Sequence, residues 1–405
     1  MALILKNEPL TRTDIAFQAP TQVKFGVGKV ATLGQELQIE DDLGELTGVV
    51  VITDAALARL GVVDRVRAGL EGSPYDVRAV FDDVPPDSDV RAVEAAARAL
   101  ADAGAELIVA VGGGSVIDTA KAAAVLATHG GRIHDYEGLY MVPGPCMPIV
   151  AIPTTCGTGS EVSGGAVVKD HEAKIKVILG SPYVFPRMAV LDPEMLRSLP
   201  DRLVAYTGMD AMTHAIEAFV STDREPFSEA LALRAVEMLY DNLPSAVADR
   251  ENTDALSKVQ IAAAMAGIAF TNAVLGATHA IAHSIGSLLG LHHGLSNAVA
   301  LPYVMEYNLE SCPSRYAALA VAMGVERAER TEAELAAAAV ERLRDLNRRI
   351  GIPTCYAELG VEGDAAMLGE IAEAAMNDPC LAFNPRPTEP ADMEGLVRRC
   401  LTGAL

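Results

Sequence analysis

The chain contains 405 residues, of which 50% are apolar and 21% charged; this suits two globular cores and excludes a disordered or fibrous protein. A formal net charge of −22 argues against nucleic acid or an anionic membrane surface as the main partner. The six scattered cysteines form no C-x-x-C pair, which favours a reduced, cytoplasmic protein over a disulfide framework.

The sequence also argues against a membrane partner. The first residues, MALILKNEPLTRTD, lack the apolar core of a signal peptide. The most apolar stretch, residues 261–275, is interrupted by Thr271 and Asn272 and is too short to span a bilayer. We therefore expect this stretch to form a buried helix.

The N-terminal half alternates apolar, β-branched runs with segments of helical spacing. The run GVVVITD (48–54) is typical of a parallel strand that is buried on both faces of a sheet. The other predicted elements are a strand at 20–27, a helix at 55–70, a strand at 77–81, a helix at 89–103, a strand–glycine turn–helix unit at 106–127, a strand and polar loop at 148–162, polar strands at 165–179 and a strand at 188–194. This alternation predicts an α/β domain with a doubly wound, mostly parallel sheet.

Beyond Pro200 the pattern changes to Ala-, Leu-, Met- and Glu-rich segments at helical spacing, and the β-branched runs disappear. The predicted helices lie at 201–220, 228–240, 254–270, 278–289, 296–309, 331–349 and 364–376, and similar segments continue to the C-terminus. We therefore predict two domains, an α/β domain over residues 1–198 and an all-helical domain over residues 199–405.

A glycine loop, GGGS at 112–115, joins the strand LIVAV to a helix that begins VIDTAK. Successive backbone N–H groups and a helix N-terminus form an anion cradle that suits a pyrophosphate. The loop is not the G-x-G-x-x-G fingerprint, because Ile117 stands where the last glycine belongs. It is not a Walker loop either, because Lys121 does not follow the glycines directly. A tight strand–helix turn without a ligand is the alternative interpretation of this loop alone.

A second polar loop favours the nucleotide interpretation. The segment PTTCGTGSE (153–161) also follows an apolar strand, and it carries the hydroxyls of Thr154, Thr155, Thr158 and Ser160 around two glycines. Open α/β sheets bind nucleotides at the carboxyl ends of neighbouring strands. The two loops together therefore predict a dinucleotide site in the N-terminal domain.

Asp54 closes the strand GVVVIT. A carboxylate there can accept hydrogen bonds from an adenosine ribose and would repel a 2′-phosphate, which favours NAD over NADP. In an ordinary Rossmann domain this acid follows the glycine loop, whereas here it precedes the loop, so the connectivity must differ. The alternative role for Asp54 is as the N-cap of a helix that begins at Ala55.

The C-terminal half contains a dense set of potential metal ligands. Asp210 and His214 stand four residues apart, as do His279 and His283, so each pair projects from one face of a helix. The six candidate side chains are those of Asp210, His214, His279, His283, His292 and His293. A single histidine in an apolar helix is usually a core residue. Four histidines within residues 276–297, however, argue for a metal site. Fe(II), Zn(II) or another first-row divalent ion suits such donors, and spacing alone does not decide which histidines bind.

These motifs resemble a known family, the iron-containing (group III) alcohol dehydrogenases. The matching segments are GGGSVIDTAK (112–121), PTTCGTGSE (153–161), MAVLDP (188–193), TGMDAMTHAIEA (207–218) and HAIAHSIGSLLGLHHGLSNAVALP (279–302). They span most of residues 20–310 in the family's order, whereas residues 310–405 resemble the family only as helices. The resemblance implies a dehydroquinate synthase-like architecture in which a dinucleotide-binding α/β domain precedes a helical metal-binding domain.

Carried over motif by motif, the resemblance also implies roles for individual residues. The implied metal ligands are Asp210, His214, His279 and His293. The implied cofactor contacts are Asp54, Gly113, Gly114, Ser115, Asp118, Thr154, Thr155, Thr158 and Lys176. His283 matches a histidine that lies beside the nicotinamide without binding metal, and His292 matches no role. One departure is Asp87, which stands where many members carry asparagine before proline.

The implied activity is that of a metal-dependent, NAD(P)-linked alcohol dehydrogenase or aldehyde reductase. A hydride would pass between nicotinamide and a small alcohol held at Fe(II), with Zn(II) or another divalent ion as the alternative metal. His283 would relay a proton, or would only pack against the nicotinamide ring. The family further implies a homodimer or a higher homo-oligomer.

Two rival interpretations come from other classes of protein. One is a lyase or polyol dehydrogenase of the dehydroquinate synthase or glycerol dehydrogenase type, which uses zinc with fewer protein ligands; the Asp-x-x-x-His pair argues against it. The other is a nucleotide-binding module whose metal is only structural, and an open coordination position would argue against that.

Overall fold

The computed structural model describes residues 14–173, 175–361, 363 and 365–403. These residues form two compact units, one made by residues 19–199 and the other by residues 200–403 together with residues 14–18. The first unit is an α/β structure and the second is helical, which confirms the predicted fold class.

A six-stranded sheet forms the centre of the α/β unit, and all its strand pairs are parallel. From one edge to the other its strands are β1 (Gln22–Phe25), β9 (Met188–Leu191), β6 (Ile149–Pro153), β4 (Leu107–Gly112), β2 (Gly48–Ile52) and β3 (Asp76–Phe81). The inner strands β2, β4 and β6 are buried along their whole length, as expected for β-branched runs with helices on both faces of a sheet. The mostly parallel sheet predicted from the sequence is therefore confirmed.

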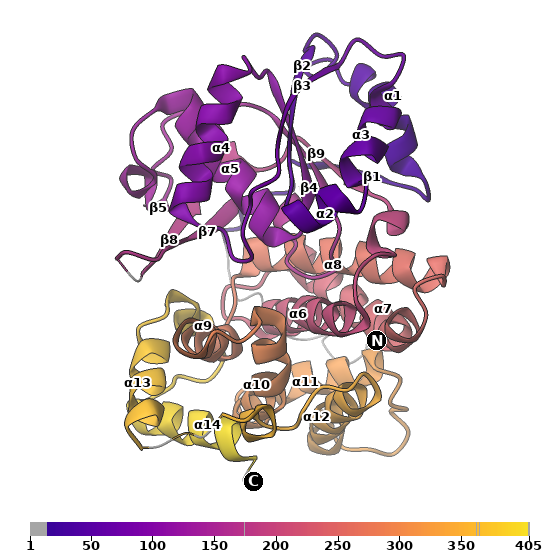
Figure 1. Cartoon of the computed structure of the whole chain (residues 1–405). Helices are drawn as coiled ribbons and strands as arrows, with labels where there is room; N and C mark the ends of the chain where they lie inside the picture. The colour runs from indigo at the N-terminus through magenta and orange to yellow at the C-terminus, as the bar shows by residue number, and fades with distance from the viewer. Residues whose placement is uncertain (1–13, 174, 362, 364, 404–405) are drawn as a thin grey trace. The chain divides into compact units, whose positions relative to one another are not determined.

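Five α-helices and a small second sheet surround this centre within the described residues. The helices are α1 (Leu33–Gln38), α2 (Ala55–Arg59), α3 (Val62–Leu70), α4 (Val90–Asp102) and α5 (Gly114–His129). Figure 1 shows α4 and α5 on one face of the large sheet, with α1 and α3 on the other. The second sheet has the order β5 (Gly138–Leu139), β8 (Ile175–Gly180) and β7 (Gly165–Asp170), and it packs against α5.

One predicted helix, residues 55–70, is divided in the structure. It forms α2 and α3, because Gly61 between them adopts a left-handed conformation with φ of 78°. A residue in that conformation cannot continue a right-handed helix, and glycine reaches it without steric cost. The apolar pattern alone did not reveal this break.

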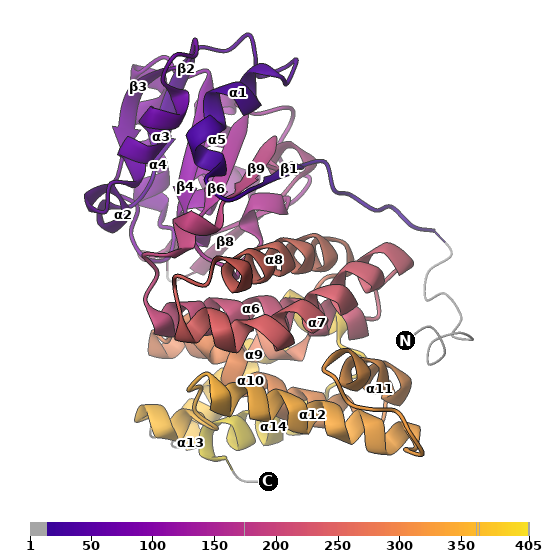
Figure 2. The same ribbon diagram turned by 90° about the vertical axis from the view of Figure 1, so that its right-hand side faces the viewer.

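The helical unit is built around α6 (Asp201–Val220), whose residues 207–220 are all buried. The remaining α-helices described are α7 (Pro226–Ala248), α8 (Thr253–Ala273), α9 (Ala277–Leu289), α10 (His293–Asn308), α11 (Pro313–Ala322), α12 (Glu332–Arg349), α13 (Ala365–Met376) and α14 (Pro390–Thr402). Helices α7, α8 and α10 pack against α6, and Figure 2 shows α8 lying next to α6 and α7. The polar residues of α6 therefore lie inside the unit.

Helix α7 is longer than the predicted segment 228–240. Its start is fixed by Glu225, whose carboxylate accepts hydrogen bonds from the backbone N–H groups of Phe227 and Ser228, and by Pro226 in the first turn.

Among the described residues, no single helix has the length and apolar character to cross a membrane; α8 and α9 meet that test only when counted together across a 104° bend.

Candidate metal centre and cofactor loops

Helix α6 carries three buried polar side chains on one face. Asp210, His214 and Glu217 are separated by four and then three residues, which aligns them along a helix. Each is at most 4% exposed. Buried polar groups need partners, so this face must be met by polar groups from other helices.

Helices α9 and α10 supply those partners. Helix α9 ends at Leu289, Gly290 follows in a left-handed conformation, and α10 begins at His293. A Cβ atom on Gly294 would lie 2.2 Å from the carbonyl oxygen of Tyr206. The glycine after His293 therefore allows the first turn of α10 to lie directly against α6.

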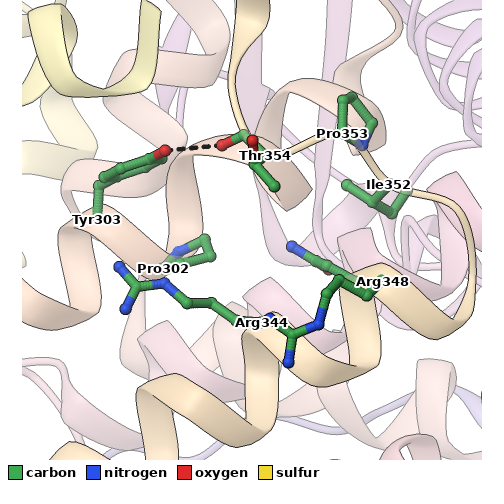
Figure 3. Close-up of a pocket in the computed structure, with 8 residues that line it drawn as sticks. Pro302, Tyr303, Arg344, Arg348, Ile352, Pro353 and Thr354 are labelled. Atoms are coloured by element: carbon green, nitrogen blue, oxygen red, sulfur yellow. Dashed lines mark hydrogen bonds between the residues drawn. The ribbon is translucent and has the colours of Figure 1, made fainter. Parts of the chain in front are cut away.

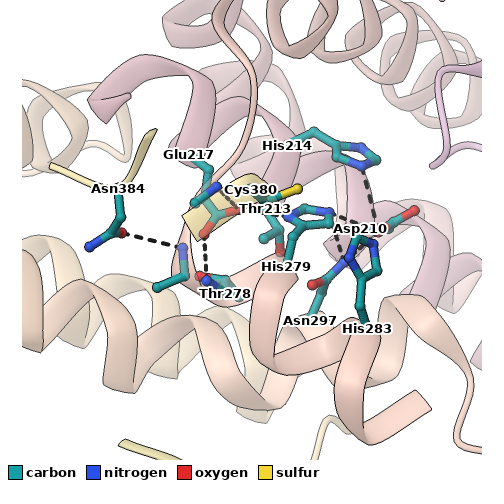
Figure 4. Close-up of polar contacts among 12 residues, drawn as sticks. Asp210, Thr213, His214, Glu217, Thr278, His279, His283, Asn297, Cys380 and Asn384 are labelled. Atoms are coloured by element: carbon teal, nitrogen blue, oxygen red, sulfur yellow. Dashed lines mark hydrogen bonds and ion pairs between the residues drawn. The ribbon is translucent and has the colours of Figure 1, made fainter. Parts of the chain in front are cut away.

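The structure brings together the four residues that the resemblance implies as metal ligands. The Oδ1 atom of Asp210 lies 3.4 Å from Nε2 of His293, 3.9 Å from Nε2 of His214 and 4.0 Å from Nε2 of His279. One candidate ligand atom from each of the four lies within 4.8 Å of the others. Figure 4 shows Asp210, His214 and His279 pointing toward one another. We call Asp210, His214, His279 and His293 the metal cluster.

Ring packing holds the imidazoles of the metal cluster in place. The ring of His214 stacks between Phe270 and His279, with centroid distances of 4.4 and 4.8 Å. The ring of His279 is in turn 5.4 Å from that of His293. Aromatic contacts of this kind limit rotation of each ring, so the nitrogen atoms stay directed at Asp210.

The carboxylate of Asp210 is stabilised in its charged form. Burial opposes ionisation, but the three neighbouring imidazoles and the amide of Asn297 outweigh it, and the pKa of Asp210 falls to about 2. A buried carboxylate that remains charged next to imidazoles is a suitable ligand for a divalent cation. One carboxylate and three imidazoles form a donor set that fits Fe(II) or Zn(II).

Glu217 supports one of the histidines. Its Oε2 atom lies 2.6 Å from Nδ1 of His279 and accepts a hydrogen bond from the backbone N–H of Gly276, while Oε1 accepts one from Thr278 N–H. Burial raises the pKa of Glu217, yet these hydrogen bonds outweigh it and the net pKa is lowered. With Nδ1 held by a carboxylate, Nε2 of His279 is left to face the cluster.

Glu217 was not identified from the sequence as a site residue. The signal was present, because Glu217 lies three residues after His214 on the face that carries Asp210. Its partner His279 is 62 residues away in the chain, so the pairing itself could not be read from local spacing.

His283 lies next to the metal cluster but has a different partner. Its Nδ1 atom is 2.8 Å from Oδ2 of Asp378, the residue that precedes the short helix η7 (Pro379–Phe383). Burial raises the pKa of Asp378, but the hydrogen bond from His283 outweighs it, so the net pKa is lowered. The ring of His283 also stacks on His293 at 5.2 Å. Asp378 is a second residue that the sequence did not identify, because it contacts His283 across 95 positions.

His292, to which the resemblance gave no role, directly precedes α10. Its ring lies 5.4 Å from the ring of Tyr206. It is not one of the three histidines grouped with Asp210.

In the α/β unit, the glycine loop (residues 112–115) and the threonine loop (residues 153–161) are in contact. A Cβ atom on Gly113 would lie 3.1 Å from Cγ2 of Thr155, and one on Gly114 would lie 2.7 Å from Cγ2 of Thr158. Strands β4 and β6, which lead into the two loops, are neighbours in the sheet. The two loops thus meet at the start of α5, where backbone N–H groups are directed outward.

Asp118 and Lys121 of α5 bind the end of the threonine loop and the residues just after it. The carboxylate of Asp118 accepts hydrogen bonds from Ser160 Oγ and from the N–H of Val167, and burial raises its pKa. The buried ammonium of Lys121 donates to the carbonyl oxygens of Ser163 and Gly165 at 2.9 and 2.7 Å, and burial lowers its pKa to about 8. In this structure Asp118 thus binds protein groups of the threonine loop and of β7.

Asp54 begins helix α2. Its Oδ1 atom accepts hydrogen bonds from the N–H groups of Ala56 and Leu57 at 2.8 and 2.9 Å. The N-cap role that the sequence offered as an alternative is therefore present. It leaves Oδ2 of the same carboxylate outside the cap, so capping and ribose recognition are compatible.

The remaining predicted contacts of the α/β unit lie near the glycine loop or on the small sheet. The N–H of Asp87, a residue with a positive φ of 61°, donates to Ser115 Oγ. The carboxylate of Asp87 pairs with Lys169 at 2.6 Å. Lys169 is directly opposite Lys176 in the antiparallel pair β7–β8. Ser115, Asp87 and Lys169 are therefore linked, with Lys176 directly across the sheet from Lys169.

A separate pocket opens on the helical unit between α10 and α12 (Figure 3). It is lined by Pro302, Tyr303, Arg344, Asn347, Arg348, Ile352, Pro353 and Thr354. The guanidinium of Arg344 is paired with Glu306 and with Glu341, at 2.6 and 2.7 Å. Because this cation is already neutralised, the pocket presents fewer groups for binding or catalysis than the metal cluster does.

Comparison with known proteins places these features in context. Residues 20–193 match the family model described as iron-containing alcohol dehydrogenase, and residues 204–401 match the C-terminal model of the Fe-containing alcohol dehydrogenase family. The chain is 35% identical to NAD-dependent methanol dehydrogenase of Bacillus methanolicus over 95% of this chain and 99% of that protein. It is 35% identical to 1,3-propanediol dehydrogenase of Klebsiella pneumoniae, covering 93% and 96% of the two chains. A crystal structure of 1,3-propanediol oxidoreductase superposes with a TM-score of 0.92 at 34% identity, over 96% of this chain and 100% of that one.

Proposed function

Since this chain belongs to the iron-containing alcohol dehydrogenase family and is a metal-dependent, NAD-linked alcohol dehydrogenase, we propose that its metal cluster binds Fe(II) and that its substrates are short primary alcohols or diols. The observation that carries this proposal is the convergence of Asp210 with three imidazoles inside 4.8 Å. The substrate class is supported by relatives that are named for methanol and 1,3-propanediol.

A bound divalent ion supplies Lewis acidity to the alcohol oxygen, and NAD supplies the acceptor for the hydride. The chain's own residues create the conditions for this chemistry. Asp210 provides negative charge in a buried position, where electrostatic interactions are strong. Glu217 holds His279 in one orientation and one tautomer. Stacking against Phe270 limits rotation of the His214 ring.

His283 is proposed to carry the proton that leaves the alcohol. Asp378 accepts the hydrogen bond from Nδ1, which leaves Nε2 as the nitrogen that can take up a proton. The Asp378–His283 pair has the same arrangement as a general base with its orienting carboxylate. Packing against the nicotinamide ring is the alternative role for this histidine.

NAD is proposed to bind at the two loops of the α/β unit. Gly113, Gly114 and Ser115 would contact the pyrophosphate, supported by their position at the start of α5, where backbone N–H groups have no partner within the helix. The proposed neighbours of the remaining cofactor groups are Asp54, Asp118, Thr154, Thr155, Thr158 and Lys176. The carboxylate of Asp54, between β2 and α2, favours NAD over NADP.

The experiment that tests the proposed function is metal removal followed by reconstitution. Protein treated with a chelator is expected to lose NAD-linked oxidation of short primary alcohols and diols, and to recover it with Fe(II) more fully than with Zn(II). Undiminished turnover by the fully metal-free protein would rule out the metal mechanism. Turnover of a sugar phosphate without net formation of NADH would point instead to a lyase.

A homodimer in the cytoplasm is also proposed. The edge strand β1 exposes Val23 and Phe25, each 41% exposed, and Val27 just after it is 56% exposed. An apolar sheet edge of this kind favours pairing with a second chain. The six cysteines are free thiols, as expected in a reducing compartment. Sedimentation analysis of the protein with and without Phe25→Lys measures the self-association directly.

A further inference from the structure

A fifth side chain reaches the centre of the metal cluster. Asn297 lies one turn after His293 on α10 and is fully buried. Its amide nitrogen is 2.8 Å from Oδ1 of Asp210, 3.0 Å from Nε2 of His279 and 3.2 Å from Nε2 of His293. Figure 4 shows this amide directed at Asp210 and His279. No motif in the sequence assigned a role to Asn297.

The three contacts of the Asn297 amide differ in whether they can remain when the acceptor atom also binds a metal ion. An imidazole nitrogen has one lone pair, so a nitrogen that binds an ion cannot also accept a hydrogen bond. A carboxylate oxygen has more than one lone pair and can do both. The hydrogen bond from Asn297 to Asp210 is therefore the contact that can persist when the cluster holds an ion.

The other end of the amide supports this interpretation. The Oδ1 atom of Asn297 is buried and has no hydrogen-bond partner among the residues that the structure describes. A buried acceptor without a partner lowers stability. The position of Asn297 is thus not explained by satisfaction of its own hydrogen bonds, whereas its donor end meets a buried carboxylate.

We propose that Asn297 is a positioning residue of the metal centre, whose amide holds the carboxylate of Asp210 with Oδ1 facing the three imidazoles and so sets the affinity for the ion. The proposal rests on the proposed function, because it requires that the metal cluster binds a divalent ion. Groups that orient metal ligands in this way typically change affinity by about 10- to 100-fold when they are removed.

The test compares three variants in full-length protein, with Zn²⁺ as the probe ion in competition with a chromogenic chelator. Asn297→Ala is expected to weaken Zn²⁺ binding by about 10- to 100-fold. Asn347→Ala is the matched control, because Asn347 is also buried, donates one hydrogen bond to α10 (to the carbonyl of Ala298) and has an unpaired Oδ1. This control is expected to leave Zn²⁺ affinity unchanged. Asp210→Ala is expected to abolish binding.

Spectra of the Co²⁺-substituted proteins separate positioning from general loosening. Loss of the amide should alter the visible absorption of bound Co²⁺ in Asn297→Ala and not in Asn347→Ala, because only the former changes how Asp210 binds. Asn297→Ser, also too short to reach Asp210, serves if the alanine variant does not fold. Unchanged or tighter Zn²⁺ binding in these Asn297 variants would overturn the proposal. Full binding by Asp210→Ala would instead reject the metal centre itself.

Discussion

The metal cluster is built from side chains, whereas the two proposed cofactor loops, the glycine loop and the threonine loop, are built mainly from backbone. The cluster is made of side chains from three helices, all directed at one point, and each is held by a second group such as Glu217, Phe270 or Asn297. The cofactor loops are made mainly of backbone, and they fit together because Gly113 and Gly114 have no side chains. Removing atoms should therefore damage the first site, whereas adding atoms should damage the second.

The largest effect is expected where a central side chain of the cluster is removed. Asp210→Ala should abolish stoichiometric metal binding and lower kcat by about a thousandfold or more, because a Lewis acid contributes several kcal/mol to the transition state. Metal analysis of the purified protein and turnover of a short alcohol measure both effects. The exposed Asp241 of α7 provides a control, since Asp241→Ala should alter neither. Normal metal content in Asp210→Ala would contradict the conclusion that the metal site is built from the side chains of the metal cluster.

A smaller effect is expected when the group behind a ligand is altered. Glu217→Gln removes the charge that His279, Gly276 and Thr278 all meet, and it should weaken metal binding by about 10- to 100-fold. Chelator competition measures the affinity, and thermal unfolding of the metal-free protein separates this effect from a general loss of stability. Equal affinities in the variant and the parent would show that His279 needs no carboxylate behind it.

The cofactor loops provide the opposite test. Gly114→Ala adds a Cβ atom 2.7 Å from Cγ2 of Thr158, and overpacking of this kind typically costs about 1–3 kcal/mol. We expect KM for NAD to rise about tenfold, which corresponds to about 1.4 kcal/mol, while the metal content stays normal. Steady-state kinetics with varied NAD measure the change.

The Gly114 prediction has a built-in rescue. Thr158→Ser removes Cγ2, the atom nearest to the new Cβ, but keeps Oγ1 and Cβ of the side chain at 3.0 and 3.1 Å, so the double variant should recover part of the affinity for NAD. Gly369→Ala on α13 adds a Cβ where no atom lies within 4 Å and should leave KM unchanged. A double variant as impaired as Gly114→Ala would contradict the proposed contact between the loops.

The sequence predicted those parts of the molecule that depend on local pattern. The buried strands β2, β4 and β6 were recognised because their β-branched runs are continuous, and the pairing of Asp210 with His214 follows from helical spacing. The same spacing could not distinguish the role of His279 from that of His283, because both lie on one face of a helix. In the structure His279 meets Glu217 and the cluster, whereas His283 meets Asp378.

The parts that local pattern could not predict depend on distant residues. Asp378 is 95 positions from His283, and Asn297 is 87 positions from Asp210, so no periodicity within one helix identifies either contact. The break between α2 and α3 was missed for a different reason. A left-handed residue such as Gly61 interrupts a helix without changing the apolar pattern around it.

The smallest effect concerns Asp54, which both positions backbone and is proposed to offer a side chain to the cofactor. Its carboxylate caps α2 through Oδ1, and it is proposed to repel the 2′-phosphate of NADP. A charge contact of about 1 kcal/mol in water predicts a shift of about fivefold to tenfold toward NADP in both Asp54→Ser and Asp54→Ala. Serine can still cap the helix, so only the alanine variant should also lose about 1 kcal/mol of unfolding free energy. Relative kcat/KM for NADP and NAD, together with urea denaturation, measure the two effects. If the ratio of kcat/KM for NADP to that for NAD rises only in Asp54→Ala, Asp54 acts on the cofactor through the helix cap. Its role would then be to position the backbone, as in the glycine and threonine loops, and not to contact the cofactor with its side chain.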